Sequence, residues 1–357
     1  MTDLEIVRRR LFNHSLSVSQ FEKPEDVVKW LGAVQAQDYP GAKWALGLRA
    51  KGLKDSAIEQ AFNAGRILRT HLLRPTWHFV TPADIRWMLA LTAPRVNAVN
   101  ASYHRKLELD DAVFSRSNAA LARALQGNNQ LTRKVLGFVL QQAGIIASGI
   151  RFAYLLMRAE LDGIICSGPR RGKQFTYALL DERAPKVKSL KRDEALAELT
   201  RRYFTSHGPA IIADFVKWSG LTTTDARAGL EMVKSEILHE EIEGKIYWFA
   251  ANSPAVRRGS KAAYLLPAYD EYCVAYKDYS LTLDPVYYQQ AILGNALVIN
   301  GRSAGSWKRT FNEGAVVITS NPFSKLTDSE NRAVAAAARR YGEFLEMPVV
   351  MEGNPRT

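Results

Sequence analysis

Apolar residues recur at helical spacing over 27–34 and then give way to a polar stretch. Pro24 suits the first turn of this helix, because its missing N–H needs no partner there. Pro40 and the glycine after it predict the helix end. Gln35 and Gln37 would then flank Ala36 at that end. Residues two apart on a helix point to nearly opposite sides, so the glutamines share a pocket only if the chain leaves helical geometry between them.

Three segments share one order of elements: three helices followed by two strands joined by a polar turn. This order is the winged-helix arrangement, and the second segment shows it most clearly. Its helices are expected over 118–126, 131–143 and 150–161, and its strands over 163–167 and 175–179. The turn between those strands carries the cations of 170–173.

The third segment has the same order of elements but a different charge. We expect its helices over 195–204, 211–219 and 222–237, and its strands over 238–242 and 246–250. The turn between these strands is acidic, with Glu240, Glu241 and Glu243, and is a poor phosphate binder. The three segments therefore should not all face DNA alike.

The first segment contains the glutamines. We expect a strand over 45–49, a helix over 56–64, buried extended chain over 69–80 and a helix over 82–91. Charged, apolar-poor linkers follow at 105–111 and 183–192.

From residue 262 onward the pattern changes to short strands, with a hairpin turn at Asn300-Gly301 and a final helix over 330–345. The predicted fold class is α+β, with three tandem winged-helix modules followed by a small β-rich C-terminal domain. The expected domains are residues 1–110, with the glutamines, then 111–188, 189–258 and the β-rich 259–357.

Composition indicates a globular protein with a polyanionic partner. The 357 residues are 47% hydrophobic and include 48 Lys and Arg against 36 Asp and Glu, a net charge of +12. Nucleic acid is the leading candidate partner, although a basic balance also occurs in proteins that bind no DNA.

Other compositional features narrow the class. Cys166 and Cys273 are far apart and lie in apolar surroundings, as expected of reduced thiols. No stretch reaches the ~20 apolar residues of a membrane span, and the N-terminus lacks signal-peptide features. We expect a cytoplasmic protein with no metal and no cofactor.

Three motifs together carry a family resemblance. Gln35-Ala-Gln37, then the segment Arg69 to Val80, and then Leu266-Pro-Ala-Tyr-Asp270-Glu271 with Tyr276-Lys-Asp278 resemble the AlkZ family of bacterial DNA glycosylases. The resemblance implies tandem winged helices, a barrel-like C-terminal domain and a glutamine–apolar–glutamine catalytic motif. Polar surface residues remain the alternative interpretation of the glutamines from pattern alone.

On this resemblance we expect Gln35 and Gln37 to be catalytic and His78 to line the pocket. From the residues alone, Tyr39 and Trp77 are better explained as core aromatics, and His78 as a core or surface histidine. Cations at the tip of a hairpin can reach phosphate oxygens. The hairpin of the second segment, residues 163–179, is therefore a candidate DNA contact, and we call it the second wing. The candidate substrate and DNA contacts are Tyr39, Lys43, Arg69, Arg74, Trp77, His78, Arg170, Arg171 and Lys173.

The resulting hypothesis is a monomeric, monofunctional DNA glycosylase that excises N7-alkylated purines from damaged duplex DNA, and it extends to the unhooking of crosslinks. The alternative is a non-catalytic winged-helix DNA-binding protein or transcriptional regulator. Charge and repeats fit both hypotheses, and only the glutamine pair separates them.

Overall fold

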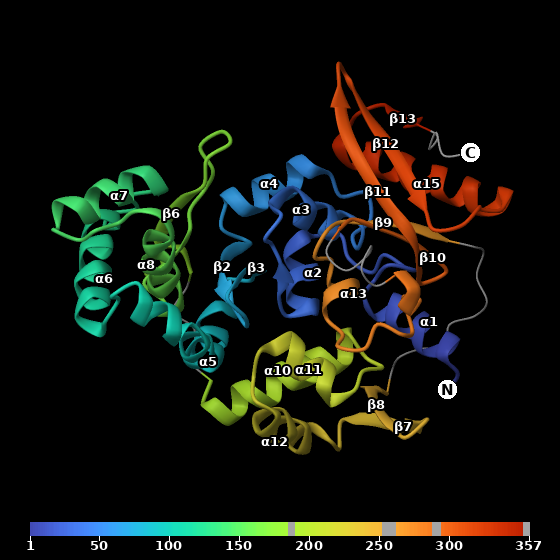
Figure 1. Cartoon of the computed structure of the whole chain (residues 1–357), viewed down its shortest axis with the longest axis horizontal. Coiled ribbons are helices and arrows are strands. Elements are labelled where there is room, and N and C mark those ends of the chain that lie inside the picture. Colours follow the sequence, from blue (N-terminus) through green and yellow to red (C-terminus); the bar gives the residue numbers. More distant parts are fainter. Residues whose placement is uncertain (185–189, 252–261, 288–293, 353–357) are drawn as a thin grey trace.

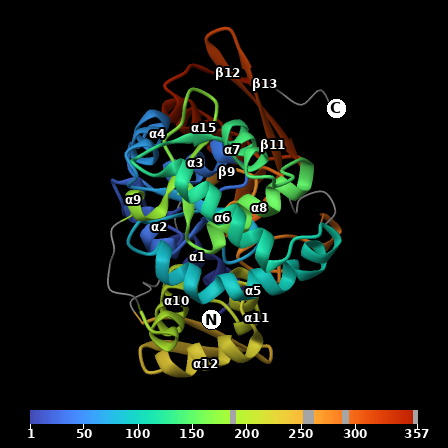
Figure 2. The same cartoon turned by 90° about the vertical axis from the view of Figure 1, so that its left-hand side faces the viewer.

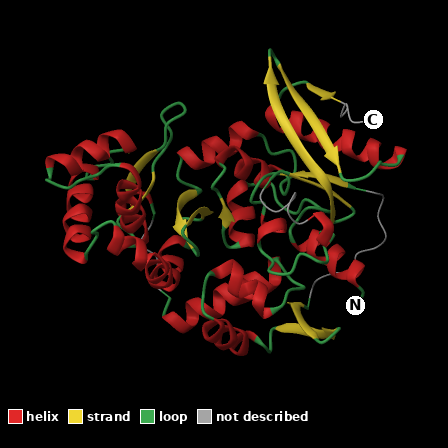
Figure 3. Ribbon diagram, viewed as in Figure 1, coloured by secondary structure: helices red, strands yellow, loops and turns green. Residues whose placement is uncertain are grey.

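The computed structural model describes residues 1–184, 190–251, 262–287 and 294–352. Figure 1 shows the first segment at the centre, the second segment on one side of it and a C-terminal sheet on the other, with the third segment below. The turned view in Figure 2 puts the second segment in front of the first. Helices and strands are mixed throughout, as Figure 3 shows, so the predicted α+β class is confirmed.

The first segment combines helices with a small antiparallel sheet of order β1-β3-β2. Its elements are α1 (Asp3–Asn13), α2 (Pro24–Leu31), β1 (Val34–Gln35), α3 (Tyr39–Gly47), α4 (Asp55–Asn63), β2 (Leu68–Leu72), β3 (Thr76–Val80) and the long α5 (Ile85–Lys106). The extended chain expected over 69–80 is confirmed as the β2–β3 hairpin.

Two sequence predictions in this segment are wrong. The helix that begins at Pro24 ends at Leu31, because Gly32 takes a φ of 80° that turns the chain into β1. Pro40 lies in the first turn of α3, where proline starts a helix as readily as it stops one. The strand expected over 45–49 is instead the buried end of α3 and the residues after it.

The second segment has the predicted order of three helices and a hairpin, with an added short strand in a sheet of order β4-β6-β5. Asp110 caps its first helix by accepting the N–H of Val113 at 2.7 Å. Its elements are α6 (Asp111–Leu125), β4 (Leu131–Thr132), α7 (Arg133–Gln142), α8 (Gly149–Leu161), β5 (Ile165–Ser167), β6 (Thr176–Leu179) and α9 (Leu180–Arg183).

The third segment repeats the order without the extra strand. Its elements are α10 (Arg192–Ser206), α11 (Ile212–Ser219), α12 (Thr223–Val233), β7 (Ile237–Ile242) and β8 (Lys245–Ala250). The hairpin is tied back to the protein, because Lys245 Nζ lies 2.6 Å from Asp278 Oδ2 and the N-terminal amine pairs with Glu240.

The C-terminal region is a five-stranded sheet of order β13-β12-β11-β10-β9. Over the described residues β13 and β9 form its two edges, so the sheet is open where the resemblance implied a barrel. The Asn300-Gly301 turn joins β10 to β11 as predicted. The elements are β9 (Ala263–Leu266), α13 (Glu271–Val274), η1 (Pro285–Tyr287), β10 (Ala296–Ile299), β11 (Arg302–Asn312), β12 (Ala315–Pro322), α15 (Asp328–Leu345) and β13 (Val349–Glu352).

The hydrophobic cores cross the expected domain boundaries. One core joins α2, α3 and α4 to the C-terminal sheet and α15, and Trp44 Nε1 there donates to the carbonyl oxygen of Leu265 at 2.6 Å. A second core joins the β2–β3 hairpin and α5 to the third segment. The second segment has a core of its own and also contributes Leu161, Cys166 and Leu180 to the second core. The boundaries expected near 188 and 258 lie outside the described residues, and the four-domain division stays a prediction.

None of the described helices combines the length and apolarity needed to cross a membrane. The same part of the chain holds no group of three or more His, Cys, Asp or Glu side chains placed to bind a metal ion.

Candidate active site

Gln35 lies in strand β1, and Gln37 follows in the bend that leads into α3, so the pair does not stand at the end of the helix that begins at Pro24. Val34 and Gln35 pair with Phe79 and His78 of β3, and the N–H of Ala36 continues the ladder to the carbonyl oxygen of Trp77 at 2.7 Å. Alternation along extended chain sends residue 36 to the opposite side from residue 35. Ala36 is fully buried in the core, which accounts for a small apolar residue between two glutamines.

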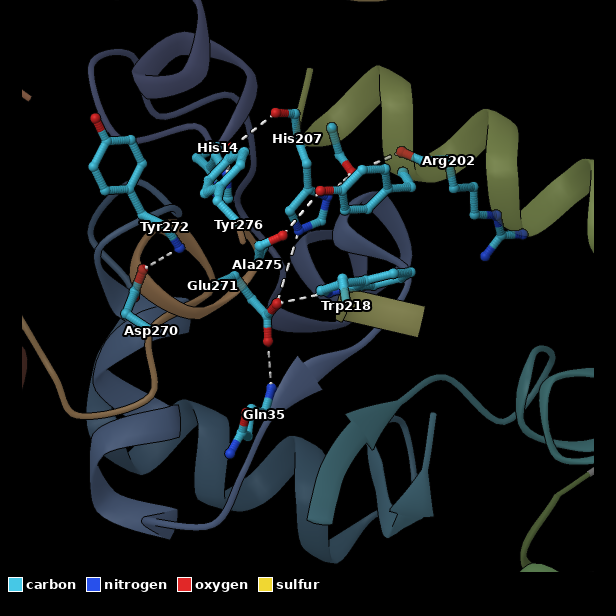
Figure 4. A network of polar contacts seen from close by, with 12 residues as sticks. His14, Gln35, Arg202, His207, Trp218, Asp270, Glu271, Tyr272, Ala275 and Tyr276 are labelled. Atoms are coloured by element: carbon cyan, nitrogen blue, oxygen red, sulfur yellow. Dashed lines mark hydrogen bonds and ion pairs between the residues drawn. The ribbon is translucent and has the colours of Figure 1, made fainter. Parts of the chain in front are cut away.

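Gln35 is held at both its backbone and its side chain. Its N–H donates to Glu271 Oε1 at 2.6 Å, and its Oε1 accepts from Arg74 Nη2 at 2.9 Å. Figure 4 shows the backbone nitrogen facing the Glu271 carboxylate, with the side chain directed away from it. Gln35 is only 8% exposed, so these two contacts fix its position.

Glu271 is a fully buried carboxylate at the start of α13. Trp218 Nε1 donates to its Oε2 at 2.9 Å, and His207 Nε2 lies 3.8 Å from the same oxygen. Burial alone would raise the pKa of Glu271, but His207 and the Arg74 charge outweigh burial and lower the pKa to about 2. The site therefore contains a carboxylate that stays ionised at neutral pH.

Gln37 differs from Gln35 in its freedom. It is exposed, and its Oε1 accepts the N–H of Trp77 over a long 3.4 Å. In a regular ladder the Trp77 N–H would donate to the carbonyl oxygen of Ala36. That oxygen instead accepts a hydrogen bond from Arg69 Nε at 3.0 Å. The amide of Gln37 can therefore turn toward a substrate at little cost.

The Trp77 ring has the Arg69 guanidinium and the His71 ring as neighbours on one face of the small sheet. The Arg69 guanidinium is 4.3 Å from the Trp77 ring centroid, and the His71 ring is 4.4 Å from it. Glu160 pairs with His71 from α8. Arg69 is 8% exposed, so it holds Trp77 beside Gln37 and offers little surface of its own to DNA.

His78 lies opposite Gln35 in the ladder and is fully buried. Its Nδ1 donates to the carbonyl oxygen of Thr76 at 2.9 Å. Burial, assisted by the Arg74 charge, lowers the pKa of His78 to about 3, so the ring is neutral. His78 thus supports the back of the site and is not a cationic contact.

Tyr39, Lys43 and Arg170 meet at one carboxylate. Glu59 Oε2 accepts from the Tyr39 hydroxyl at 3.1 Å and from Lys43 Nζ at 2.9 Å. Asp55 also binds Lys43 Nζ, at 2.7 Å, and the Arg170 guanidinium lies 4.9 Å from the Tyr39 ring centroid. The buried Lys43 is therefore a structural cation, and its expected role as a DNA contact is not supported by its position.

The second wing keeps two exposed cations at its tip, Arg171 and Lys173. Arg170 instead joins the wing to the first segment, since its backbone N–H donates to Asn63 Oδ1 at 2.8 Å and its guanidinium pairs with Glu59 at 3.7 Å. Positive charge is also concentrated in the first half of the sequence. Residues 1–188 hold 28 Lys and Arg against 16 Asp and Glu, whereas residues 189–357 hold 20 of each.

Sequence reasoning missed the residues behind Gln35. Glu271 stood in a motif used for the resemblance, but no role followed from it, because its distance in sequence from Gln35 hides their contact. Trp218 and His207 carried no signal that separates them from core residues. The structure brings Arg74, Trp77, His78 and Arg69 around the glutamines, while Arg171 and Lys173 lie farther along the chain on the wing.

The chain is similar to known proteins over nearly its whole length. A family model described as DNA glycosylase AlkZ-like matches residues 28–344. An interstrand DNA cross-link repair glycosylase of Streptomyces sahachiroi is 25% identical over 232 residues, an alignment that spans 62% of each chain. The solved structure of Streptomyces sahachiroi DNA glycosylase AlkZ matches the fold with a TM-score of 0.83 at 21% identity, over 99% of this chain and 100% of that one.

Proposed function

Because this chain belongs to the AlkZ-like DNA glycosylase family, we propose that it hydrolyses the bond between an alkylated purine and its deoxyribose in duplex DNA. The Streptomyces sahachiroi relative is named for interstrand cross-link repair. We extend the proposal to purines joined through N7 in such crosslinks.

The chemistry asks for positioning more than for a strong acid. A purine alkylated at N7 is already cationic, so the bond from C1′ to N9 breaks with its electron pair neutralising the base. The oxygen of a water molecule forms the new bond to C1′, and the proton of that water passes to solvent. Neutral amides that hold and align the water are sufficient for this step.

One observation carries the proposal: two glutamine amides, two residues apart between α2 and α3, one clamped and one exposed. Gln35 is held by Glu271 and Arg74, while Gln37 is reachable from solvent. A surface pair without function has no need of a buried ionised carboxylate behind it, since burying a charge is costly.

We further propose that the three helix–helix–helix–hairpin segments are winged-helix modules of a monomer that binds duplex DNA. The excess positive charge lies in residues 1–188, which supports binding through the first two modules. The acidic hairpin of the third segment supports a different role for that module.

Release of free base from alkylated duplex DNA tests the proposal. Under single-turnover conditions, Gln35→Ala and Gln37→Ala should each lower the excision rate of 7-methylguanine while duplex binding stays within about twofold, because exposed or neutral substitutions disturb binding little. A tenfold loss corresponds to about 1.4 kcal/mol of barrier. Gln60→Ala, an exposed glutamine on α4, is the matched control and should excise at the wild-type rate.

Two outcomes contradict the proposal. If both alanine variants excise at the wild-type rate, the glutamines are structural. If the wild type binds duplexes but releases no base from any alkylated substrate, the non-catalytic winged-helix alternative replaces the glycosylase.

A further inference from the structure

The amide of Gln35 has one possible orientation. Arg74 Nη2 lies 2.9 Å from Gln35 Oε1, and a guanidinium group has donors but no acceptor. The carbonyl oxygen of the amide must therefore face Arg74, and the NH₂ group must face elsewhere. Arg74 is itself held, since its Nη1 donates to the carbonyl oxygens of Lys217, at 3.3 Å, and of Trp218.

The backbone of Gln35 is fixed from the opposite direction. The N–H of Ala36 points to β3, so in an antiparallel pair the N–H of Gln35 points away from it. Glu271 Oε1 accepts this edge N–H at 2.6 Å, while Glu271 Oε2 accepts from Trp218 at 2.9 Å (Figure 4). With one oxygen committed to each partner, the carboxylate cannot rotate without losing a buried hydrogen bond.

Among the described residues, none clamps the amide of Gln37 in a comparable way. Its Oε1 receives the N–H of Trp77 at 3.4 Å, near the limit of a hydrogen bond, and the side chain is exposed. Either end of this amide can face a substrate. Two residues of the same type thus differ in what they can offer.

We propose that Arg74 and Glu271 are positioning residues that give the two glutamines unequal roles. Gln35 turns its NH₂ donors toward the nucleotide or a lone pair of the water, because its carbonyl oxygen is directed at Arg74, whereas Gln37 supplies the carbonyl oxygen that accepts a hydrogen bond from the attacking water. This inference rests on the proposed glycosylase function. In the step, the water oxygen bonds to C1′, the C1′–N9 pair leaves with the base, and the proton shared with Gln37 Oε1 passes to solvent.

Carboxylate swaps separate the two roles. Gln37→Glu keeps an acceptor and should excise 7-methylguanine within about tenfold of the wild-type rate, since the hydrogen bond to water remains. Gln35→Glu removes both donors and pairs with Arg74, so its rate should fall by ~100-fold or more, the loss typical of removing a transition-state donor. Duplex affinity should be similar in both variants, because each changes the charge by the same amount.

A double-mutant cycle tests whether Arg74 acts through Gln35. Arg74→Met should lower the rate in the wild-type background but cause no further loss in a Gln35→Ala background. Arg74→Lys, which retains a donor, should recover part of the rate. Arg340→Met is the matched control. Arg340 lies on α15, and its Nη2 similarly donates to a backbone carbonyl oxygen, that of Leu48, at 2.6 Å. Glu271→Gln, which keeps an acceptor for the Gln35 N–H, should lose less activity than Glu271→Ala.

The outcomes distinguish this inference from the function on which it rests. Equal rates for the two carboxylate swaps, or a full additional loss from Arg74→Met without Gln35, would overturn the assigned roles while leaving a wild-type glycosylase intact. A wild type that releases no base would remove the proposed function and this inference with it. If Arg74→Met does not fold, the swaps alone decide, since both retain Arg74.

Discussion

The tip of the second wing offers a quantitative test of where DNA binds. Arg171 and Lys173 are exposed there, whereas the Arg170 guanidinium pairs with Glu59 at 3.7 Å and lies 4.8 Å from the Phe175 ring centroid. Neutralising the two exposed residues together, as Arg171→Gln with Lys173→Gln, should weaken binding to all duplexes alike. Arg170 should be left in place, because its loss would also disturb the wing.

The expected magnitude follows from counterion release. Each lost phosphate contact lowers the log–log salt slope by ~0.9, so two contacts lower it by up to ~1.8. Between about 50 and 200 mM salt, the affinity loss of the variant would then be about twelvefold smaller than that of the wild type. Fluorescence anisotropy of an undamaged labelled duplex at several salt concentrations measures both slopes.

A matched control removes the same charge elsewhere. Arg227→Gln with Lys234→Gln changes two exposed cations of the third segment and should leave the slope unchanged. A wild-type slope in the wing variant would show that this hairpin faces away from DNA. An equal drop in the control would show that net charge, and not the wing, sets the slope.

Three further predictions concern stability and the support of the site. Arg49 and Asp270 form a fully buried bidentate pair at 2.7 and 2.8 Å, so Asp270→Asn should cost ~3–5 kcal/mol in urea unfolding, against less than ~1 kcal/mol for the exposed pair changed in Glu231→Gln. Burial lowers the pKa of His14, His78 and His207, so the unfolded chain binds protons that the folded chain does not. The free energy of unfolding should therefore fall as pH drops below about 6.5, by up to ~1.4 kcal/mol per pH unit for each histidine. His78→Gln should make this pH dependence less steep. His239→Gln, at an exposed position, is the control and should leave the slope as it is. Gly220 has a φ of 69°, and a Cβ there would lie 2.3 Å from the carbonyl oxygen of Leu73. Gly220→Ala should therefore lower the free energy of unfolding by more than ~1 kcal/mol and slow excision, because it displaces the turn that carries Arg74. Gly127→Ala is the control for backbone strain alone, since Gly127 has a similar φ of 78° but open space around it.

Local patterns predicted most elements but not their tertiary partners. Helical spacing and the turn at Asn300-Gly301 depend on neighbours in sequence, and these predictions agree with the structure. The start of α12 is fixed locally in the same way, because Thr222 caps it by accepting the N–H of Asp225 at 3.1 Å. Pro40 misled because proline is compatible with the first turn of a helix and incompatible with its interior, and the pattern does not say which applies.

The site was predicted in part for the same reason. The glutamines were found by resemblance, but their departure from helical geometry depends on Gly32 turning the chain into a strand that pairs with β3. Glu271 lies 236 positions from Gln35, a contact that no local pattern reports. Lys43 was predicted to contact DNA because the sequence does not reveal that Asp55 and Glu59 pair with it.

The neutral third segment has a physical role that its charge alone does not suggest. The end of α11 supplies the carbonyl oxygens that hold Arg74, and Trp218 supplies the donor that holds Glu271. Its hairpin is tied to Asp278 and to the N-terminal amine, so the segment is braced on two sides. Two sets of residues therefore contribute separable quantities: changes to the exposed cations of residues 1–188 should alter the salt slope of DNA binding, whereas changes to the α11 residues that hold Arg74 and Glu271 should alter the excision rate at constant affinity. A third-segment variant that changed the salt slope and left excision untouched would contradict this separation.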